Sequence, residues 1–373
     1  MIGHHAFRGM QALALGLAVT AGSVAAAQAQ TKIKLVLNWK YEGPQGMFFL
    51  AQDRGYFKQE GLDVTFDQGN GSGAAVPQVA NGAYDMGFGD INALVELAAK
   101  KPDEAPIGVF MLYNRPPFAV AVKADSPIKT PADFVGRKLG GAANDGALKL
   151  FPALCAATKI DCSKVEIVNM QPNLREQMLM QGQVDGVFGY ITTIRFSAKL
   201  TGVDPDKQLR FIKFEDYGMD LYSNAIIVSR KFVNEYPEAV KGFLKALNHG
   251  VKDAIADPQA AIDAVVTREP LVKPAIERAR LDATLADEMS HPEIAKIGLW
   301  RCQRRSNDKS DRYLGQGQGT DAYAHGWRDI RPQFSAAGQR TANFDAPGDV
   351  TTQNRSSHFL SQSMRMNSHE TFA

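Results

Sequence analysis

Strand-like and helix-like segments alternate along most of this chain, and this alternation constrains its fold more than any other feature of the sequence. The apolar stretch Lys32–Leu37 has the length of a buried strand, and Pro44 begins a helical pattern that continues to Leu50. Leu62–Phe66 is a second strand-like stretch, and Ile91–Lys100 again has helical spacing. Because strands that alternate with helices over short connections form parallel sheets covered by helices, the sequence predicts the α/β class.

The later part of this region reads as helical. The pattern after Arg230 predicts three helices, each of which begins with proline, over Pro237–Asp257, Pro258–Thr267 and Pro274–Met289. The body of the protein, which we take as Gln30–Leu299, therefore ends in helices.

The first 29 residues have the organisation of a secretory signal peptide. His4, His5 and Arg8 precede an apolar stretch, Ala12–Ala27, and a small-residue site predicts cleavage after Ala29. The stretch is too weakly apolar to serve as a membrane anchor, and no cysteine near the cleavage point offers a site for lipid attachment. We therefore expect export to the bacterial periplasm without a lipid anchor.

Residues 300–373 differ in composition from the body. They contain only six Leu, Ile, Val or Met residues, and no helical or strand period persists. Such a segment buries too little apolar area to offset its chain entropy, which predicts a poorly structured tail. Its charge of +3 and the +1 of the first 29 residues leave −2 on the body, so the total of +2 gives no reason to expect nucleic acid as a partner.

A nine-residue pattern occurs twice, one hundred residues apart. Residues 81–89 and 181–189 place glycine, aspartate, phenylalanine and glycine at the same spacing. We expect the first glycine of each to end a helix in the left-handed conformation, and the second to let the backbone pass close to another group. Because ligands in open α/β sheets lie outside the carboxyl ends of strands, Asp90 and Tyr190, which follow the two repeats, should face one cleft from two lobes. The alternative is coincidence, since helix–glycine–strand units are common.

Several motifs of the body carry a resemblance to a known family. They are LVLNW at residues 35–39, GMFFLA at 46–51, RGYFK at 54–58, EGLD at 60–63 and VANGAYDMGFG at 79–89. With them the sequence resembles the nitrate/sulfonate/taurine and thiamine-pyrimidine class of periplasmic substrate-binding proteins of ABC importers. The similarity extends to about Leu299.

The resemblance implies a bilobed periplasmic-binding-protein fold of type II, in which two parallel-rich sheets are joined by two crossing strands. The crossing points are expected at Asn114–Phe118 and Tyr217–Asn224. Lobe 1 would then comprise about residues 30–115 and 220–299, and lobe 2 about residues 118–217. The implied function is capture of a small molecule by hinge closure and its delivery to an ABC permease and its ATPase. The protein would be a monomer with only peripheral contact with the membrane complex.

The family's usual ending is not recognisable after Leu299. When Trp300–Phe344 is back-translated and the reading frame is moved by one base, an amphipathic amino-acid sequence is possible. It ends in EIFDRSFLPP, which resembles the family's last segment. We therefore hypothesise that residues 300–373 are a frameshift product. Resequencing the gene around Leu299 tests this, because independent reads with the present frame intact would refute it.

Candidate ligand contacts come from the loops that follow predicted strands. Trp39 and Tyr41 follow the first strand, where the family places an aromatic face against the ligand, although Trp39 could instead pack between the lobes. Ser72 lies in a glycine-rich loop before a helix, where free N–H groups attract polar groups, although the loop could also be an ordinary flexible turn. Asp90 and Asn92 could contact ligand or cap the helix that begins at Ile91.

In the second lobe, Asn144 and Asp145 join a strand to a helix, and both are also typical N-cap residues. Tyr190 follows the second repeat, and Asp220 precedes a crossing point. The full set of expected ligand-binding residues is Asn38, Trp39, Tyr41, Ser72, Asp90, Asn92, Asn144, Asp145, Tyr190 and Asp220.

The charges of these candidates suggest a class of ligand. Asp90, Asp145 and Asp220 would make the cleft acidic, which favours a pyrimidine-like or other amine-bearing heterocycle and leaves an alkanesulfonate or taurine second. A sulfonate pocket would need arginine or several N–H donors, and Arg115 is the only obvious arginine near the hinge.

The sequence contains no Ser/His/Asp, HExxH or paired CxxC arrangement, so we expect no catalytic residue, no metal and no cofactor. Cys155 and Cys162 could form a short disulfide in an oxidising compartment, but their separation alone does not decide whether they pair.

Two other classes of function are open. The resemblance includes pyrimidine-synthesising enzymes that use a cysteine-rich motif and iron, but this chain has 3 cysteines and no such cluster. We therefore expect that the protein is not an enzyme. A ligand sensor that docks on a receptor without transport is the other alternative, and an adjacent permease and ATPase gene would argue against it.

Overall fold

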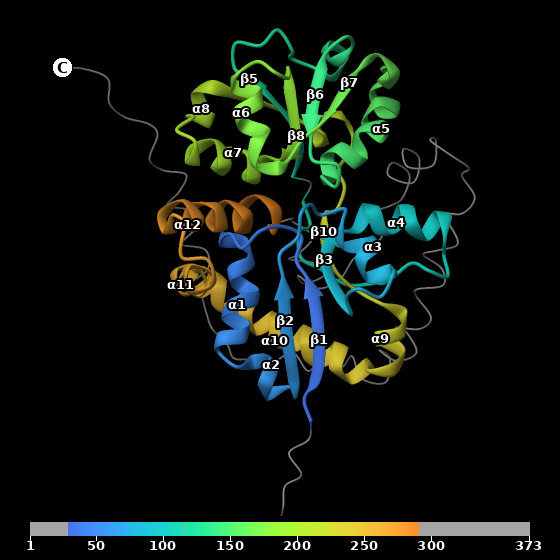
Figure 1. The fold of residues 1–373 in the computed structure, drawn as a ribbon, viewed down its shortest axis with the longest axis vertical. Coiled ribbons are helices and arrows are strands. Elements are labelled where there is room, and N and C mark those ends of the chain that lie inside the picture. Colours follow the sequence, from blue (N-terminus) through green and yellow to red (C-terminus); the bar gives the residue numbers. More distant parts are fainter. Residues whose placement is uncertain (1–28, 116, 291–373) are drawn as a thin grey trace, which may run out of the picture. The chain divides into compact units, whose positions relative to one another are not determined.

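The computed structural model describes residues 29–115 and 117–290. In this part of the chain, ten strands form two five-stranded sheets, each accompanied by helices (Figure 1). The predicted α/β class with two sheets is confirmed. The expected signal peptide, apart from Ala29, and the expected tail lie outside the described residues.

The first sheet combines strands from distant parts of the sequence. It contains β1 (Thr31–Val36), β2 (Leu62–Asp67), β3 (Met86–Asp90), β4 (Ile107–Met111) and β10 (Asn224–Val228). The strand order is β2-β1-β3-β10-β4. β1 runs parallel to β2 and β3, whereas β10 is antiparallel to both of its neighbours. We call this sheet and the helices packed on it lobe 1.

The second sheet repeats this arrangement. It contains β5 (Phe118–Lys123), β6 (Lys138–Gly141), β7 (Glu166–Asn169), β8 (Gly186–Tyr190) and β9 (Leu209–Lys213), in the order β7-β6-β8-β5-β9. Here β5 is the strand that is antiparallel to both neighbours. We call this sheet and its helices lobe 2.

The chain passes between the sheets twice. Residues 112–117 connect β4 in the first sheet to β5 in the second, and residues 214–223 connect β9 to β10. Both connections coincide with the expected crossing points. Each strand that follows a crossing inserts beside the central strand of the other sheet, which explains why β5 and β10 are the antiparallel strands.

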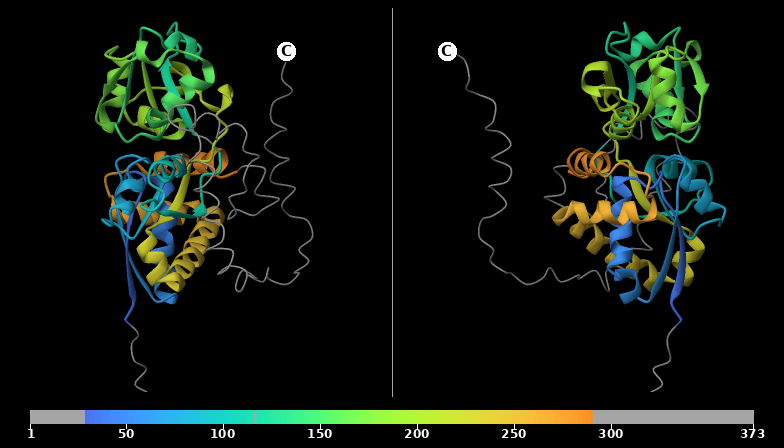
Figure 2. Two further views of the ribbon diagram at one scale, coloured as in Figure 1. Left: turned by 90° about the vertical axis from the view of Figure 1, so that its right-hand side faces the viewer. Right: turned by 60° about the vertical axis from the view of Figure 1, so that its left-hand side comes forward.

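Helices occupy most of the connections between strands. They are α1 (Gly46–Asp53), α2 (Tyr56–Gln59), α3 (Ala75–Ala80), α4 (Ile91–Lys100), α5 (Gly146–Thr158), α6 (Arg175–Met180), α7 (Ile191–Leu200), α8 (Pro205–Gln208), α9 (Arg230–Glu235), α10 (Pro237–Ala256), α11 (Pro258–Arg268) and α12 (Pro274–Ala283). Both α10 and α11 pack against α1 in lobe 1 (Figure 2).

Short turns of 3-10 helix supplement them. They are η1 (Gly43–Gln45), η2 (Pro131–Phe134), η3 (Cys162–Lys164), η4 (Pro172–Leu174) and η5 (Glu215–Tyr217), and a π-helical turn, η6 (Thr284–Glu288), follows α12. Two predicted helices therefore differ from the structure. The helix expected from Pro44 begins as the 3-10 turn η1, and the helix expected to reach Met289 changes to the π-helical turn after Ala283.

The repeated glycines end helices as predicted. Gly82 follows α3 with φ 80°, and Gly182 follows α6 with φ 73°. Both lie in the left-handed region, where a side chain costs other residues about 1–2 kcal/mol. The residue after each glycine donates its N–H back to the preceding helix, as in a Schellman motif.

The repeated aspartates also have one role in both lobes. The Asp85 carboxylate accepts the N–H of Lys34 at 2.9 Å, and the Asp185 carboxylate accepts the N–H of Lys138 at 2.8 Å. In each case the aspartate's own N–H donates back to the same lysine carbonyl. The two repeats therefore fasten the central strand of each sheet to its parallel neighbour, which supports a common architecture rather than coincidence.

The repeated phenylalanines anchor the core of each lobe. Phe88 and Phe188 are both fully buried, and each has an aromatic neighbour, Phe48 at 5.2 Å and Phe151 at 5.0 Å between ring centroids. Full burial of such a side chain contributes about 1.5–3 kcal/mol. These anchors hold the carboxyl ends of β3 and β8 in place, where Asp90 and Tyr190 end the strands and directly precede α4 and α7.

Cys155 and Cys162 form a disulfide, with Cα atoms 5.9 Å apart. It links the last turn of α5 to η3 and answers the question that the sequence left open.

Candidate ligand-binding site

Two small cavities lie between the lobes, where the carboxyl ends of strands from both sheets meet. Their volumes are about 30 Å³ and 20 Å³, and four residues line both of them: Asn38, Trp39, Tyr190 and Thr193. Asn38 and Trp39 follow β1 of lobe 1, whereas Tyr190 ends β8 of lobe 2. This is the position at which ligands bind in open α/β sheets.

Trp39 presents an unused hydrogen-bond donor at the cavities. Its indole Nε1 is buried and has no partner among the described residues. A buried N–H without an acceptor is costly, about 1–3 kcal/mol. The neighbouring Asn38, in contrast, has a hydrogen-bond partner, because its side-chain oxygen accepts a hydrogen bond from the Gln45 amide at 2.9 Å.

Ser72 and Asp90 of lobe 1 lie directly against the start of α5 in lobe 2. A Cβ atom placed on Gly146 would lie 2.7 Å from the Ser72 Oγ and 3.0 Å from the Asp90 Oδ2. The absence of a side chain at Gly146 therefore allows the two lobes to approach at this point. Ser72 also lines the larger of the two cavities.

Asp90 caps α4, the alternative that the sequence offered for this residue. Its carboxylate accepts the N–H and the side-chain amide of Asn92, at 3.0 and 2.7 Å. Burial raises the pKa of Asp90 to about 7 because desolvation outweighs these hydrogen bonds. The Asn92 amide also donates to the Tyr222 carbonyl, so Asn92 is engaged in structure and does not line either cavity.

Asn144 and Asp145 bring the start of α5 to the cleft. The Asn144 carbonyl accepts the N–H of Gly73 from lobe 1 at 3.1 Å. Asp145 caps α5, lines the larger cavity and lies 3.7 Å from Arg175. Burial raises the pKa of Asp145, although the positive charge of Arg175 opposes the shift.

Tyr190 reaches from lobe 2 to the second crossing segment. Its hydroxyl donates to Asn224 Oδ1 at 2.8 Å and shares a second hydrogen bond of 2.8 Å with the Ser223 hydroxyl. Burial raises the pKa of the Tyr190 hydroxyl well above its ordinary value, so the group stays protonated. Tyr190 thus joins the lobes beside the cavities that it lines.

Two expected contacts lie away from the cavities. Tyr41 is half-buried, packs edge-on against Phe49 and donates its hydroxyl to the Phe66 carbonyl at 2.6 Å. Asp220 is exposed on the second crossing segment. Neither lines the two cavities, so the structure does not bring them to the other candidates.

Two buried arginines line the cavities and were not predicted from the sequence, where only Arg115 was noted near the hinge. Arg175 begins α6 and lines the larger cavity, whereas Arg280 of α12 lines the smaller one. Each side chain is 1% exposed. A signal for Arg280 was present in the sequence, since Glu277 lies three residues before it on a helix. The search near the hinge missed both arginines because they come from elements remote from the hinge in sequence.

Arg175 depends on the second repeat. A Cβ atom on Gly189 would lie 2.5 Å from the Arg175 Nη1, and the same atom donates to the Phe188 carbonyl at 3.4 Å. In lobe 1, a Cβ on Gly89 would lie 2.7 Å from Ala75 and 2.9 Å from the Ser72 carbonyl. The last glycine of each repeat therefore permits a close approach, as predicted.

Carboxyl groups outnumber the arginines here. The acidic side chains at or directly behind the cavities are Glu42, Asp90, Asp145, Glu176, Glu277 and Glu288. Burial raises the pKa of Glu288 to about 8 and also raises the pKa of Glu42. The acidic character that the sequence predicted is present, but it comes from a set that shares only Asp90 and Asp145 with the predicted one.

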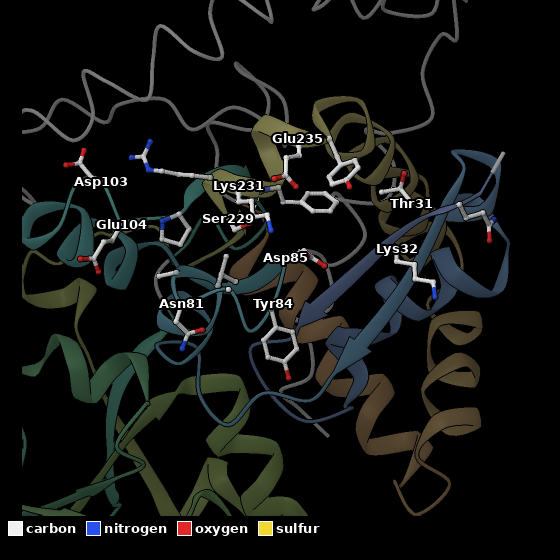
Figure 3. A pocket seen from close by; sticks show the side chains of 18 of the residues that line it. Thr31, Lys32, Asn81, Tyr84, Asp85, Asp103, Glu104, Ser229, Lys231 and Glu235 are labelled. Atoms are coloured by element: carbon white, nitrogen blue, oxygen red, sulfur yellow. Dashed lines mark hydrogen bonds between the residues drawn. The ribbon is translucent and has the colours of Figure 1, made fainter.

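A larger pocket, of about 820 Å³, lies at the opposite end of the first sheet, where β1 begins and β10 ends (Figure 3). Its labelled side chains include Lys32, Asp85, Lys231 and Glu235, and the Asp85 carboxylate is already used by the backbone of β1. This pocket lies at the amino ends of the parallel strands, away from the position where α/β sheets bind ligands.

The described residues show no group of three or more His, Cys, Asp or Glu side chains arranged to hold a metal ion. Likewise, no helix among them is long and apolar enough to cross a membrane.

Paired sheets of the same strand order, two crossings and cavities at facing strand ends define a periplasmic-binding-protein fold. Residues 45–261 match the NMT1/THI5 like family, and the chain belongs to that family. The resemblance drawn from the opening motifs is thereby confirmed.

Curated relatives of this chain carry two kinds of name. The 4-amino-5-hydroxymethyl-2-methylpyrimidine phosphate synthase of Schizosaccharomyces pombe is 23% identical over 235 residues, which cover 61% of this chain and 66% of that protein. The formylaminopyrimidine-binding protein of Halalkalibacterium halodurans is 22% identical over 272 residues, which cover 71% of this chain and 80% of that protein. We expected that the protein is not an enzyme. The comparisons contradict this expectation, because several relatives are named as synthases.

Solved structures share the fold at low identity. The alkanesulfonate-binding protein SsuA from Xanthomonas axonopodis pv. citri, bound to MOPS, matches with a TM-score of 0.54 at 17% identity, over 69% of this chain and 85% of that chain. A Candida albicans gene product described as having the generic periplasmic binding protein fold matches with a TM-score of 0.59 at 16% identity, over 81% of this chain and 95% of that chain.

Proposed function

We propose that the chain is the solute-binding component of an ABC-type importer, which captures a small polar molecule between its lobes and delivers it to a permease. A pyrimidine-like heterocycle is the favoured ligand, with an alkanesulfonate or taurine second. The observation that carries this proposal is the pair of cavities at facing strand ends, lined from both lobes and rich in carboxyl groups.

The charge of the cavities favours an amine-bearing ligand over a sulfonate. Both arginines are already paired with carboxylates, Arg175 with Glu176 at 2.7 Å and Arg280 with Glu277 at 3.0 Å. A sulfonate would have to compete with these partners for the guanidinium groups and would add another negative charge. A cationic nitrogen would instead relieve the repulsion among buried carboxylates.

Capture by lobe movement follows from the size of the cavities. Volumes of about 20–30 Å³ have room for a water molecule or two, whereas small-molecule sites typically have about 300–1,000 Å³. A heterocycle therefore needs the lobes to open. Contacts such as Gly73 N–H to the Asn144 carbonyl would reform around it, and the ligand's differential affinity would stabilise closure.

The proposed location is the periplasm, after removal of an export signal. The Cys155–Cys162 disulfide supports an oxidising compartment. The partners on this proposal are the small-molecule ligand, the permease and its ATPase.

Thermal shift of the full chain tests the ligand class. The probes are 4-amino-5-hydroxymethyl-2-methylpyrimidine, taurine and MOPS, because ligand at 100 times Kd adds about 2.7 kcal/mol of apparent stability. A shift with the pyrimidine but not with the sulfonates is the expected result. A shift with the sulfonates alone would transfer the proposal to the second ligand class, and a folded chain that responds to none would refute both.

Synthesis of a pyrimidine phosphate is the second candidate function, favoured by the names of the relatives. Expression of the chain without residues 1–29 in the cytosol of a strain that cannot make 4-amino-5-hydroxymethyl-2-methylpyrimidine phosphate distinguishes the two. Restored growth would support the synthase, whereas growth only with added pyrimidine would favour the binding protein.

A further inference from the structure

Glu288 lies where both lobes and a crossing segment meet. It ends the π-helical turn η6 and lines the smaller cavity, and it is 3% exposed. Its carboxylate accepts a hydrogen bond from the Thr192 hydroxyl of α7 in lobe 2. Its carbonyl accepts the N–H groups of Asn114 and Arg115 at 2.9 and 3.1 Å. A group bound at Glu288 therefore lies beside lobe 1, lobe 2 and the first crossing segment.

The nearest positive charge is already neutralised. Arg280 forms ion pairs with Glu42 and Glu277, both at 3.0 Å, and its Nη1 contacts the Thr193 carbonyl of lobe 2 at 3.5 Å. Arg280 attracts Glu288 electrostatically and so opposes the rise of its pKa, but its ion pairs are with Glu42 and Glu277. The guanidinium thus belongs to two other carboxylates.

The second arginine is neutralised in the same way. Arg175 pairs with Glu176 at 2.7 Å and with Asp145 at 3.7 Å. Within the described part of the chain, Glu288 has no ion-pair partner at all. Of the carboxyl groups that line the smaller cavity among the described residues, Glu288 is thus the one without an ion pair, and an isolated buried carboxylate is strongly disfavoured.

Among the described residues, the other groups that act on Glu288 are acidic or neutral, and Arg115 contacts it through its backbone N–H. The adjacent Asp287 is exposed and repels it, and Tyr113 of the first crossing segment is buried nearby with a raised pKa to which Glu288 contributes. Thr192 supplies a neutral hydroxyl. A cation bound beside this carboxyl group would balance its buried negative charge.

We propose that Glu288 receives the positively charged nitrogen of an amine-bearing ligand and is the residue that selects such ligands over neutral analogues of the same size. This inference rests on the proposed function and adds to it the side chain that distinguishes amines from neutral ligands. Because the Glu288 carboxylate also accepts the hydrogen bond from Thr192, and the Glu288 carbonyl holds the first crossing segment, an amine bound there contacts lobe 1 and lies within one hydrogen bond of lobe 2. Occupation of the site and lobe closure are linked through this one side chain.

Matched pairs of probes test the proposal by calorimetric titration of the full chain. One pair is 4-amino-5-aminomethyl-2-methylpyrimidine and its 5-hydroxymethyl counterpart; the other is benzylamine and benzyl alcohol. We expect the wild type to prefer the amine of a pair. Since hydrogen bonds to charged groups are the stronger kind, Glu288→Gln should weaken amine binding about tenfold or more and change alcohol binding less than about twofold.

Asp287→Asn is the control, because it removes the same charge from the adjacent exposed position and should leave the preference intact. Retained alcohol binding by Glu288→Gln shows that this variant is folded. Amine preference that persists in Glu288→Gln, or a wild type without preference, overturns the assignment while the pyrimidine proposal stands. If neither pyrimidine binds, the proposal of a pyrimidine ligand fails. The benzyl pair then tests the role of Glu288 alone. A wild type that binds benzylamine no better than benzyl alcohol would overturn that role.

Discussion

Gly146 of lobe 2 lies directly against Ser72 of lobe 1, so closely that a Cβ atom at position 146 would be 2.7 Å from the Ser72 Oγ. Gly146 is also the first residue of α5, where alanine is locally more favourable than glycine by about 0.5–1 kcal/mol. The two effects oppose each other. Glycine at position 146 therefore permits the close approach of the lobes, although it lowers the helix propensity of α5.

Gly146→Ala should therefore separate binding from stability. We expect the melting temperature of the unliganded chain to change little, because the gain in helix propensity of α5 offsets a tight contact of 3.2 Å with Phe118 Cε1 within lobe 2. Ligand affinity should fall by about tenfold or more, since the closed arrangement then contains a steric overlap. Gly73→Ala is the graded control, as its Cβ would lie 3.2 Å from the Asn144 carbonyl and should weaken binding less. Equal affinity of Gly146→Ala and wild type would show that this contact does not form in the bound state.

Stability should fall as pH rises through neutrality because of two buried acids. The folded state raises the pKa of Asp90 to about 7 and of Glu288 to about 8, so it keeps protons that the unfolded chain loses near pH 4. Between these values unfolding releases protons, and the free energy of unfolding decreases with pH. Relative to wild type, Glu288→Gln should gain of the order of 1–3 kcal/mol between pH 5 and pH 8.5.

Chemical denaturation at the two pH values measures this difference. Asp133→Asn is the control, because hydrogen bonds from the Lys129 and Thr130 N–H groups lower the pKa of Asp133. Its contribution is lost only as the pH falls through that lowered value, so its effect should be the same at pH 5 and 8.5. A parallel loss in wild type and Glu288→Gln would contradict the raised pKa of Glu288.

The buried ion pair of Arg175 should be sensitive to the glycine of the second repeat. Gly189→Ala puts a methyl group 2.5 Å from the Arg175 Nη1 and forces the guanidinium away from Phe188 and Asp145. Breaking a buried pair costs about 3–5 kcal/mol, and denaturant unfolding measures this cost. Gly186 is an unsuitable control because its Cβ would also overlap neighbours; Gly182→Asn, which tolerates a positive φ, should cost less than about 1 kcal/mol. Similar costs for the two variants would show that Arg175 is not held by this contact.

The disulfide should stabilise lobe 2 through its short loop. Cys155 and Cys162 are 7 residues apart, a separation for which loop-closure entropy gives roughly 2–3 kcal/mol. Reductant should lower the melting temperature of the wild type, and the double variant Cys155→Ser, Cys162→Ser should melt at the lower temperature with or without reductant. A response of the double variant to reductant would mean that another thiol causes the shift.

Much of the fold could be predicted from the sequence because its signals are local. Alternating strand and helix patterns identified Ile91–Lys100 to the residue, and the repeated glycines have the roles that their spacing suggests. The π-helical turn after Ala283 was not predictable in this way, since no residue type specifies it. Its effect is to place Glu288 at the cavity.

The candidate site was predicted less completely, because its members are assembled by tertiary contacts. Trp39, Ser72 and Asp145 follow strands of the two sheets and Tyr190 ends one, so these four could be found by position along the chain. Arg175 and Arg280 lie on helices that carry no motif, and each reaches the cavities only because it is neutralised by carboxylates and admitted by the packing. The pairing of Arg175 with Asp145 and of Arg280 with Glu42 joins residues that are far apart in the sequence, and an analysis of strand ends does not detect it.

The indole of Trp39 should contribute both a face and a donor to the ligand. Its Nε1 is buried without a partner among the described residues, so an acceptor on the ligand would satisfy it at little further cost. Trp39→Phe keeps an aromatic face and should weaken binding of the hydroxymethyl pyrimidine about fivefold, the value of one ordinary hydrogen bond. Trp39→Ala should weaken it further, because the aromatic contact worth about 0.5–1.5 kcal/mol is lost as well. Titration of both variants checks the order, and Tyr41→Phe is the control, since Tyr41 donates to the Phe66 carbonyl away from the cavities. If Trp39→Phe binds as tightly as wild type, the indole N–H faces no acceptor on this ligand and Trp39 acts through its ring alone.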